Sequence, residues 1–243
     1  MEADMTPLLP GEQFCFECSP EVPCFNECCR DLNQYLTPYD ILRLKKSLGL
    51  SSSEFLKRYT VRYTGPETGL PVVSLKQNQS EALTCPFVRP AGCAVYADRP
   101  ASCRMYPLAR ALSRSRETSE TTEHFALLKE PHCQGFTDKG AISADAWVSQ
   151  QGLKEYNAMN DRLMTLISLK NRLLPGALEP RLAELFHLAL YDLDGFRQAI
   201  FEQNLLAGLN VKAAALEKIK TDDVELLKLG LTWVRFKLFG NAE

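Results

Sequence analysis

All nine cysteines of this 243-residue chain lie before residue 134, and this uneven distribution constrains the fold more than any other feature. They are Cys15, Cys18, Cys24, Cys28, Cys29, Cys85, Cys93, Cys103 and Cys133. Residues 134–243 contain none. Cysteines that served only as small apolar core residues would be spread over both halves. The distribution therefore indicates that the N-terminal half is organised around its thiols.

The spacing of these cysteines is typical of metal ligands. It reads C-x2-C-x5-C-x3-C-C, then C-x7-C-x9-C, and finally Cys133 alone. Gaps of two or three residues let two thiolates face one ion across a single turn of backbone, as in zinc and iron–sulfur sites. Neighbouring side chains usually diverge, so Cys28 and Cys29 either serve different ions, or one is a ligand while the other packs.

The rest of the sequence indicates a reducing compartment. The N-terminal stretch 1–14 is acidic and has no apolar core, so it does not read as a secretory signal. No eighteen apolar residues run together, and we expect no membrane partner. The net charge of −2 gives no basic field for nucleic acid. We expect a cytoplasmic protein, where disulfides are rare, with an unidentified protein or redox partner.

Three other uses of the cysteines compete with a metal cluster. A disulfide framework needs an oxidising compartment. A structural zinc site alone could hold a loop-rich segment together. A catalytic cysteine would need a base, and only His124, His132 and His187 are available. The sequence favours a metal site, iron–sulfur or zinc, and predicts neither catalytic residues nor a substrate.

The hydrophobic pattern predicts an α+β fold, in which short helices and β-hairpins surround a cysteine metal site. Residues 1–36 read as ligand-bearing loop, followed by a helix that begins at Thr37-Pro38-Tyr39-Asp40 and ends near Gly49. A mainly α-helical part follows residue 140. We expect a metal-binding domain over 14–136 and a helical region over 141–243, as two domains or as one compact unit. Further predicted elements are a helix after Ser51–Ser53, a hairpin over 61–76, strands over 107–113 and 122–129, and helices over 143–170 (bent near Gly152), 182–190, 192–207, 211–220 and 222–239.

The most informative stretch runs from Cys85-Pro86-Phe87 through G-C-A-V-Y-A-D-R-P to C-R-M-Y-P at 103–107. Together with C-F-N-E-C-C at 24–29, the L-T-P-Y-D helix start and Cys133-Gln134-Gly135, it resembles the YkgJ-type cysteine-cluster family. That family is described as zinc- or iron-chelating, or as containing iron–sulfur clusters. The resemblance covers about residues 14–136.

The resemblance implies a shared ligand set and leaves Cys15 as an extra cysteine. The gap between Cys18 and Cys24 is longer than in members with a C-x2-C-x2-C-C run. The cofactor implied is an iron–sulfur cluster, with a [4Fe–4S] type favoured, or zinc. The implied ligands are Cys18, Cys24, Cys28, Cys29, Cys85, Cys93, Cys103 and Cys133. Arg99 and Arg104 flank these thiolates and can offset their charge or donate to sulfur, unless each forms only a surface salt bridge.

Three functions are consistent with this pattern. The first is a metal-cluster protein, most simply iron–sulfur, with a redox or sensing role. The second is a zinc-stabilised interaction module whose helical part supplies the partner surface. The third is a protein lysine N-methylase-like enzyme, because flagellin lysine N-methylase carries a similar cysteine pattern. The chain has no strand–glycine-loop–helix unit of the kind that holds a nucleotide, and no C-x3-C-x2-C triad.

Overall fold

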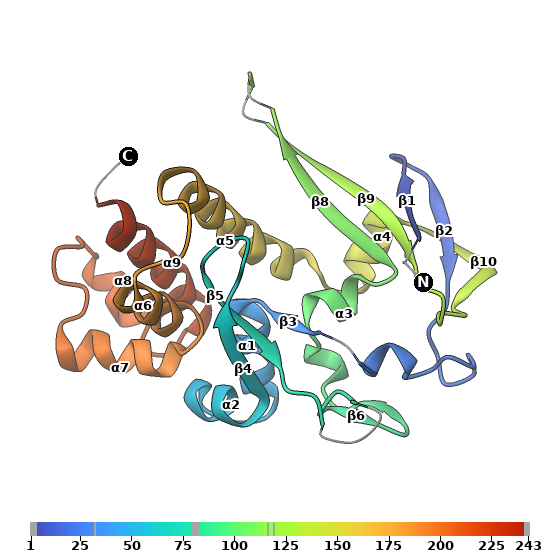
Figure 1. The fold of residues 1–243 in the computed structure, drawn as a ribbon, viewed down its shortest axis with the longest axis horizontal. Helices are drawn as coiled ribbons and strands as arrows, with labels where there is room; N and C mark the ends of the chain where they lie inside the picture. Colours follow the sequence, from blue (N-terminus) through green and yellow to red (C-terminus); the bar gives the residue numbers. More distant parts are fainter. Residues whose placement is uncertain (1–3, 32, 79–82, 116, 119, 241–243) are drawn as a thin grey trace. The chain divides into compact units, whose positions relative to one another are not determined.

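A computed structural model shows an α+β fold, as the sequence predicts (Figure 1). The structure describes residues 4–31, 33–78, 83–115, 117–118 and 120–240. Its strands form small antiparallel sheets, and its helices are concentrated in the C-terminal part.

The chain divides into two compact units, and each unit is made of two separate stretches of sequence. Unit 1 comprises Met1–Leu32 and Gln77–Glu155, and unit 2 comprises Asn33–Lys76 and Tyr156–Glu243. The division differs from the predicted segments 14–136 and 141–243, because residues 33–76 pack with the C-terminal helices. Composition along the chain marks where the cysteines end. It does not show which distant segments share a core.

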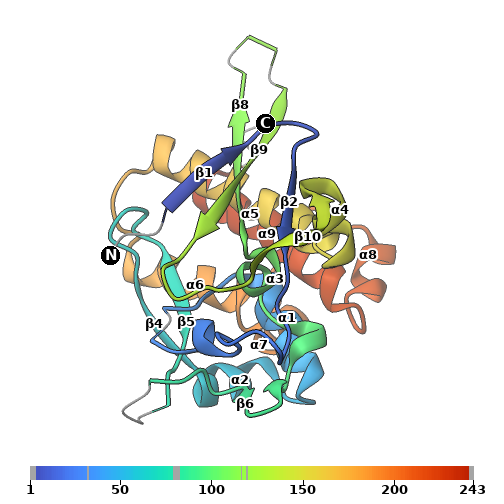
Figure 2. The same ribbon diagram turned by 90° about the vertical axis from the view of Figure 1, so that its right-hand side faces the viewer.

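Unit 1 contains three of the sheets. β1 (Asp4–Leu8) pairs with β9 (Thr121–Lys129), which also pairs with β8 (Leu108–Arg114) in a long hairpin (Figures 1 and 2). β2 (Gln13–Phe16) pairs with β10 (Phe136–Ser143), with a register shift between Phe136 and Ala141. β6 (Val88–Arg89) and β7 (Gly92–Cys93) form a two-residue hairpin. The remaining elements of unit 1 are η1 (Glu27–Cys29), η2 (Tyr96–Asp98), α3 (Ala101–Met105) and α4 (Ala144–Gln150).

The prediction that residues 1–36 are loop is wrong in part. β1 and β2 lie in this stretch, and each pairs with a strand more than a hundred residues later. β10 was also not predicted. These strands are short, and their partners are distant in sequence, so no local turn signal marks the pairing.

An aromatic cluster forms the core of unit 1. Phe14 and Phe16 of β2 both meet Trp147 of α4 edge-on, with ring centroids 5.8 and 5.7 Å apart. Phe16 also contacts Tyr106 and Phe136 at 5.6 and 5.3 Å. The Trp147 indole N–H donates to the Met105 carbonyl at 3.1 Å. This cluster fixes the segments on either side of β2 and β10, which carry several of the cysteines.

Unit 2 places a small sheet among helices. β3 (Tyr35–Leu36) and β4 (Thr60–Thr64) flank β5 (Pro71–Leu75). α1 (Pro38–Ser47) begins with the predicted capping box, in which the Thr37 side chain accepts from the Asp40 amide and Asp40 accepts from the Thr37 amide. α2 (Ser52–Tyr59) follows, capped by Ser51. Fully buried side chains, including Leu44, Phe55, Phe196 and Trp233, form the core.

The C-terminal helices agree closely with the predicted ranges. The expected bend near Gly152 is a break between α4 and α5 (Lys154–Leu173), and Gly152 has a φ of +63°. The later helices are α6 (Pro180–Leu190), α7 (Leu193–Gln203), α8 (Ala213–Lys218) and α9 (Asp223–Phe239). None of the described helices is long and apolar enough to cross a membrane.

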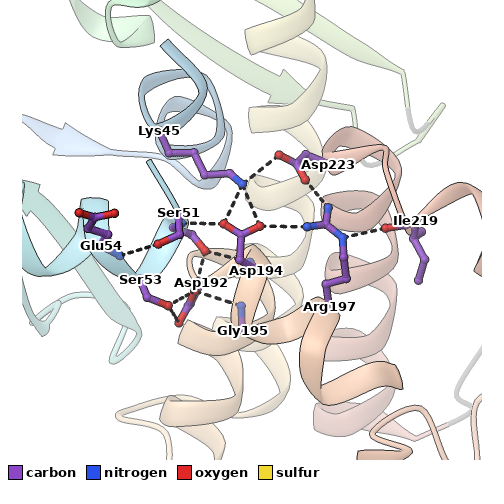
Figure 3. Close-up of polar contacts among 11 residues, drawn as sticks. Lys45, Ser51, Ser53, Glu54, Asp192, Asp194, Gly195, Arg197, Ile219 and Asp223 are labelled. Atoms are coloured by element: carbon purple, nitrogen blue, oxygen red, sulfur yellow. Dashed lines mark hydrogen bonds and ion pairs between the residues drawn. The ribbon is translucent and has the colours of Figure 1, made fainter. Parts of the chain in front are cut away.

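A charged network joins four helices of unit 2 (Figure 3). The ammonium of Lys45 in α1 lies 3.0 Å from carboxylate oxygens of both Asp194 in α7 and Asp223 in α9. Arg197 bridges the same two carboxylates from α7. The Ser52 amide at the start of α2 donates to Asp194 at 2.7 Å. Each of these charged groups therefore has a partner of opposite sign.

Candidate metal centre

Every cysteine lies in unit 1, and all nine are free thiols. Cys15 is in β2, and Cys18 follows that strand. Cys24 precedes η1, and Cys28 and Cys29 lie within it. Cys85 comes before β6, Cys93 is in β7, Cys103 is in α3, and Cys133 lies between β9 and β10. Unit 1 thus brings together cysteines from both ends of its discontinuous sequence.

Hydrogen bonds join the segments that carry the early and the late cysteines. The Gln134 amide, next to Cys133, donates to the Cys24 sulfur at 3.1 Å. The amide of Glu17, the residue before Cys18, donates to the Gly135 carbonyl at 2.8 Å. On the other side of η1, the Cys85 amide donates to the Cys29 carbonyl at 2.8 Å.

The thiols also act on one another through their charge. Burial raises the pKa of Cys18, and the neighbouring thiolates of Cys28, Cys24 and Cys133 raise it further. Burial and the Cys93 charge likewise raise the pKa of Cys85. The charges of Cys28, Cys85 and Cys103 raise the pKa of Cys29. Several negative charges this close oppose one another, and a metal ion would remove that repulsion.

Cys28 and Cys29 form a hydrogen-bonded thiol pair within η1. The hydrogen bond from Cys29 lowers the pKa of Cys28 to about 7, and the same bond raises the pKa of Cys29. The pair therefore holds one thiolate near neutral pH. A thiolate is the form of cysteine that binds metals.

The donor set fits a thiolate-bound metal in kind and number, but the thiols are not closed around a common point. Among the residues whose placement is described, no three Cys, His, Asp or Glu side chains stand close enough to hold one ion between them. Instead, hydrogen bonds and charges relate some of the thiols in pairs, such as Cys28 with Cys29 and Cys24 with Cys133, and every thiol is at least partly exposed. Zinc and iron–sulfur clusters are both held by such soft thiolate ligands.

A family model matches residues 17–134, and its description reads "CxxCxxCC: Putative zinc- or iron-chelating domain". The cysteine-bearing part of this chain is thus similar to the CxxCxxCC family, and residues 17–134 are called the CxxCxxCC domain below. The match confirms the resemblance seen in the sequence, and it supports metal binding by this domain. No curated protein and no solved structure matches the chain.

Cys15 lies just outside the matched segment of the CxxCxxCC domain. It pairs with Ala141 across the β2–β10 ladder, between Phe14 and Phe16. Successive side chains in a strand point to opposite faces. Because the two phenylalanines face the aromatic cluster with Tyr106 and Trp147, Cys15 points to the opposite side of β2. This placement is consistent with Cys15 as an extra cysteine.

Arg99 and Arg104, the two arginines that the sequence analysis singles out, differ in their contacts. Burial raises the pKa of Cys93, and the positive charge of Arg99 acts to lower it. The charge of Arg99 also acts to lower the pKa of Cys18. Its guanidinium also lies 3.8 Å from the centre of the Tyr96 ring. Arg99 therefore can offset thiolate charge, as the sequence suggests.

The guanidinium of Arg104 binds backbone carbonyls. It donates to the carbonyls of Arg99 at 3.0 Å, Gln151 at 2.6 Å and Ala97. The residue is only 8% exposed. These bonds hold η2, the start of α3 and the end of α4 together. The sequence does not reveal these backbone acceptors, and the predicted role of Arg104 toward the thiolates stays a prediction.

Tyr106 is a residue of the site that the sequence analysis overlooked. Its hydroxyl oxygen is buried and has no hydrogen-bond partner of ordinary geometry in the described part of the chain. Burial raises the pKa of Cys133, whereas the nearby Tyr106 hydroxyl acts to lower it. The R-x-Y-P run at 104–107 was the only available signal, and it does not say what the tyrosine contacts.

The histidines lie elsewhere or serve other contacts. His124 bonds Ser113 at 2.7 Å on the β8–β9 hairpin. His187 lies in unit 2, stacked against Tyr191. His132, next to Cys133, is within 3.6 Å of Glu130. The candidate donors of the CxxCxxCC domain are therefore sulfur atoms.

Proposed function

We propose that this protein binds an iron–sulfur cluster through its CxxCxxCC domain and uses it in electron transfer or redox sensing. One observation supports the proposal: the eight cysteines that the sequence resemblance implies as ligands all lie in unit 1, and the contacts described above join several of them to one another and none of them to a histidine side chain. Zinc sites often mix histidine with cysteine, whereas iron–sulfur clusters are held mainly by thiolates. A [4Fe–4S] cluster would take four of them.

The exposure of the thiols supports a redox role. Cys18, Cys28 and Cys103 are exposed, and the other shared cysteines are partly exposed. A cluster held here would lie near the surface, where a partner protein could exchange electrons with it. Solvent exposure and hydrogen bonds to sulfur also tune the reduction potential of such a cluster. The thiols must stay reduced before they bind, which suits the cytoplasm.

The residues of the chain would serve distinct roles around such a cluster. The cysteines Cys18, Cys24, Cys28, Cys29, Cys85, Cys93, Cys103 and Cys133 supply the candidate ligands. The Gln134 amide donates to the Cys24 sulfur, and Arg99 offsets negative charge on Cys18 and Cys93. When bound, the cluster supplies reversible one-electron chemistry. The Gln134 amide and the positive charge of Arg99 would both favour the reduced state of the cluster, because that state carries more negative charge.

Anaerobic purification tests the proposal directly. We expect a brown protein that contains iron and acid-labile sulfide and has the visible absorption of thiolate-bound iron. A Cys15→Ser variant should retain both, and a Cys28→Ser/Cys29→Ser variant should lose them. A colourless protein with stoichiometric zinc would overturn the iron–sulfur proposal and support the zinc-stabilised interaction module, which the family description also allows. A protein with no metal at all would contradict both.

A further inference from the structure

A cavity in unit 2 takes no part in the proposed metal site. Its volume is about 360 Å³, which is near the lower end of the range of about 300 to 1,000 Å³ that ligand pockets occupy. Its lining comes from α5, α9, α8 and the residue that follows α8, and all of these belong to unit 2. The cavity is therefore a feature of the cysteine-free unit alone.

Positive charge predominates in the lining of this cavity. Arg162 of α5, Lys218 of α8 and Lys228 of α9 contribute cations, and Glu225 of α9 is the one carboxylate among the described lining residues. The ammonium groups of Lys228 and Lys218 lie 2.8 and 3.5 Å from the same Glu225 oxygen. The Lys228 hydrogen bond and the charges of both lysines lower the pKa of that carboxyl group, so it is ionised at neutral pH. Three cations and one carboxylate leave a formal charge of +2.

Arg162 is the cation that the chain leaves uncompensated. Within the part of the chain that the structure describes, the residue is exposed and its guanidinium has neither a hydrogen bond nor an ion pair. A guanidinium presents a planar set of donors that matches the oxygens of a phosphate or carboxylate. Each lysine also keeps ammonium hydrogens beyond the one that Glu225 accepts. Donors for an anion therefore reach the cavity from all three helices.

The rest of the lining, apart from Thr232, is apolar. Ala214 and Ala215 are exposed residues of α8, Ile219 is buried directly after that helix, and Leu229 comes from α9. The small alanine side chains leave room for a bound molecule and an entry from solvent. An occupant is thus offered donors for its charge and an apolar surface for the rest of its body.

We propose that this cavity binds a phosphate monoester with a small apolar body. A phosphoryl group carries a charge of about −1.5 to −2 at pH 7, which complements the formal charge of the lining. It places that charge at one end of the molecule, where the Arg162 guanidinium and the lysines can donate to it, and leaves the other end for the apolar surface. The inference uses only residues of unit 2 and does not rest on the proposed metal binding.

Calorimetry with phenyl phosphate on the full chain, purified anaerobically with its metal, tests this inference. We expect saturable binding to one site, with inorganic phosphate and phenol each binding more weakly because they lack the apolar body or the charge. Arg162→Gln should weaken binding about tenfold or more, which is the usual loss for a hydrogen bond to a charged group. Arg172→Gln removes the same charge from an exposed position of α5 outside the cavity and should bind like the parent chain.

Two further pairs of variants separate the cavity from the general charge of the surface. Ala215→Leu should reduce binding by filling the cavity, whereas Ala213→Leu, at an exposed α8 residue that does not line it, should not. Glu225→Gln should tighten binding several-fold, because it frees both lysines, and Glu202→Gln in α7 should leave binding unchanged.

The substituted residues are all at least partly exposed, so we expect each variant to fold as the parent chain does, which circular dichroism checks. No binding of phenyl phosphate at millimolar concentration, or equal losses in Arg162→Gln and Arg172→Gln, would overturn the inference. Inorganic phosphate that binds as tightly as phenyl phosphate would also overturn it, because the apolar surface would then contribute nothing.

Discussion

At the scale of single residues, the site is defined as much by the groups that contact the thiols as by the thiols themselves. Sulfur is a weak acceptor, and a donor aimed at it changes its basicity and its strength as a ligand. The Gln134 amide donates to Cys24, and the buried Tyr106 hydroxyl near Cys133 acts to lower the pKa of that thiol. The amide belongs to the backbone and is insensitive to substitution, so Tyr106 is the one that mutagenesis can remove.

Tyr106→Phe should weaken metal binding without unfolding unit 1. The phenyl ring can keep its contact with Phe16, whereas the hydroxyl that lowers the pKa of Cys133 is lost. Removal of a residue that hydrogen-bonds a ligand typically costs about 10- to 100-fold in metal affinity. Competition with a chromophoric chelator measures the loss, and Tyr96→Phe, at an exposed tyrosine of the same domain, is the control. Equal affinities in the two variants would show that the hydroxyl does not act on the centre.

At the scale of secondary structure, the charged network of unit 2 links four helices through residues that are distant in sequence. The Lys45 side chain is 7% exposed and lies between Asp194 and Asp223, whose side chains are 31% and 23% exposed. Loss of one partner leaves charge buried without compensation. The remaining cation, Arg197, contacts both carboxylates and limits the damage.

Lys45→Met should therefore destabilise unit 2 by about 2–3 kcal/mol, somewhat below the cost of breaking a fully buried pair. The methionine retains most of the apolar stem, so the loss reports the charge. Urea unfolding followed by tryptophan fluorescence from Trp233, which is in the unit 2 core, measures it. Lys46→Met, at the exposed neighbour in α1, should change stability by less than about 0.5 kcal/mol. A similar midpoint for both variants would show that the network contributes no net stability.

The same network predicts how stability depends on pH. Burial alone would raise the pKa of Asp194, but hydrogen bonds from the Ser52 amide and the Lys45 ammonium outweigh it and lower the pKa. A carboxyl group with a lowered pKa in the folded state stabilises that state above its unfolded pKa, near about 3.9, and the benefit is lost as pH falls through the folded value. Compared with Asp194→Asn, the parent chain should be more stable at pH 7 by roughly 2 kcal/mol. The difference should shrink below pH of about 4, and a constant difference would contradict the assignment.

Local sequence signals predicted the helices and the β4–β5 and β8–β9 hairpins well, but they missed strands such as β1, β2 and β10 that pair with distant segments. The Thr37-Pro38-Tyr39-Asp40 start is a capping box in the structure, because capping involves residues three apart. β2 has only four residues, and its pairing with β10 spans more than a hundred positions. The sequence near Gln13 therefore contains no local signal that predicts this pairing. Arg104 illustrates the same limit at the site. Its position in the motif is visible in sequence, whereas the carbonyls of Ala97 and Gln151 that it binds are brought to it by folding.

At the scale of the whole molecule, the chain enters unit 1, crosses to unit 2 at residue 33, returns near residue 77, and crosses again near residue 155. Segments that carry cysteines before the first crossing contact segments after the return. A metal bound by cysteines from both stretches would therefore link the two parts of unit 1. Unit 2 contains no cysteine, and Phe55, Phe196 and Trp233 are buried in its own apolar core.

Removal of metal should therefore loosen unit 1 selectively. In the holoprotein treated anaerobically with a strong chelator, amide hydrogen exchange should accelerate by an order of magnitude or more in 13–29, 85–105 and 133–150, because the free energy of metal binding is part of the folding energy of that unit. Exchange in α6, α7 and α9 should change little. The Cys28→Ser/Cys29→Ser variant should reproduce this pattern without chelator, and Cys15→Ser should not. Uniform acceleration over both units would mean that they unfold as one, and unchanged exchange in unit 1 would mean that the aromatic cluster of Phe14, Phe16 and Trp147 holds the fold without the metal.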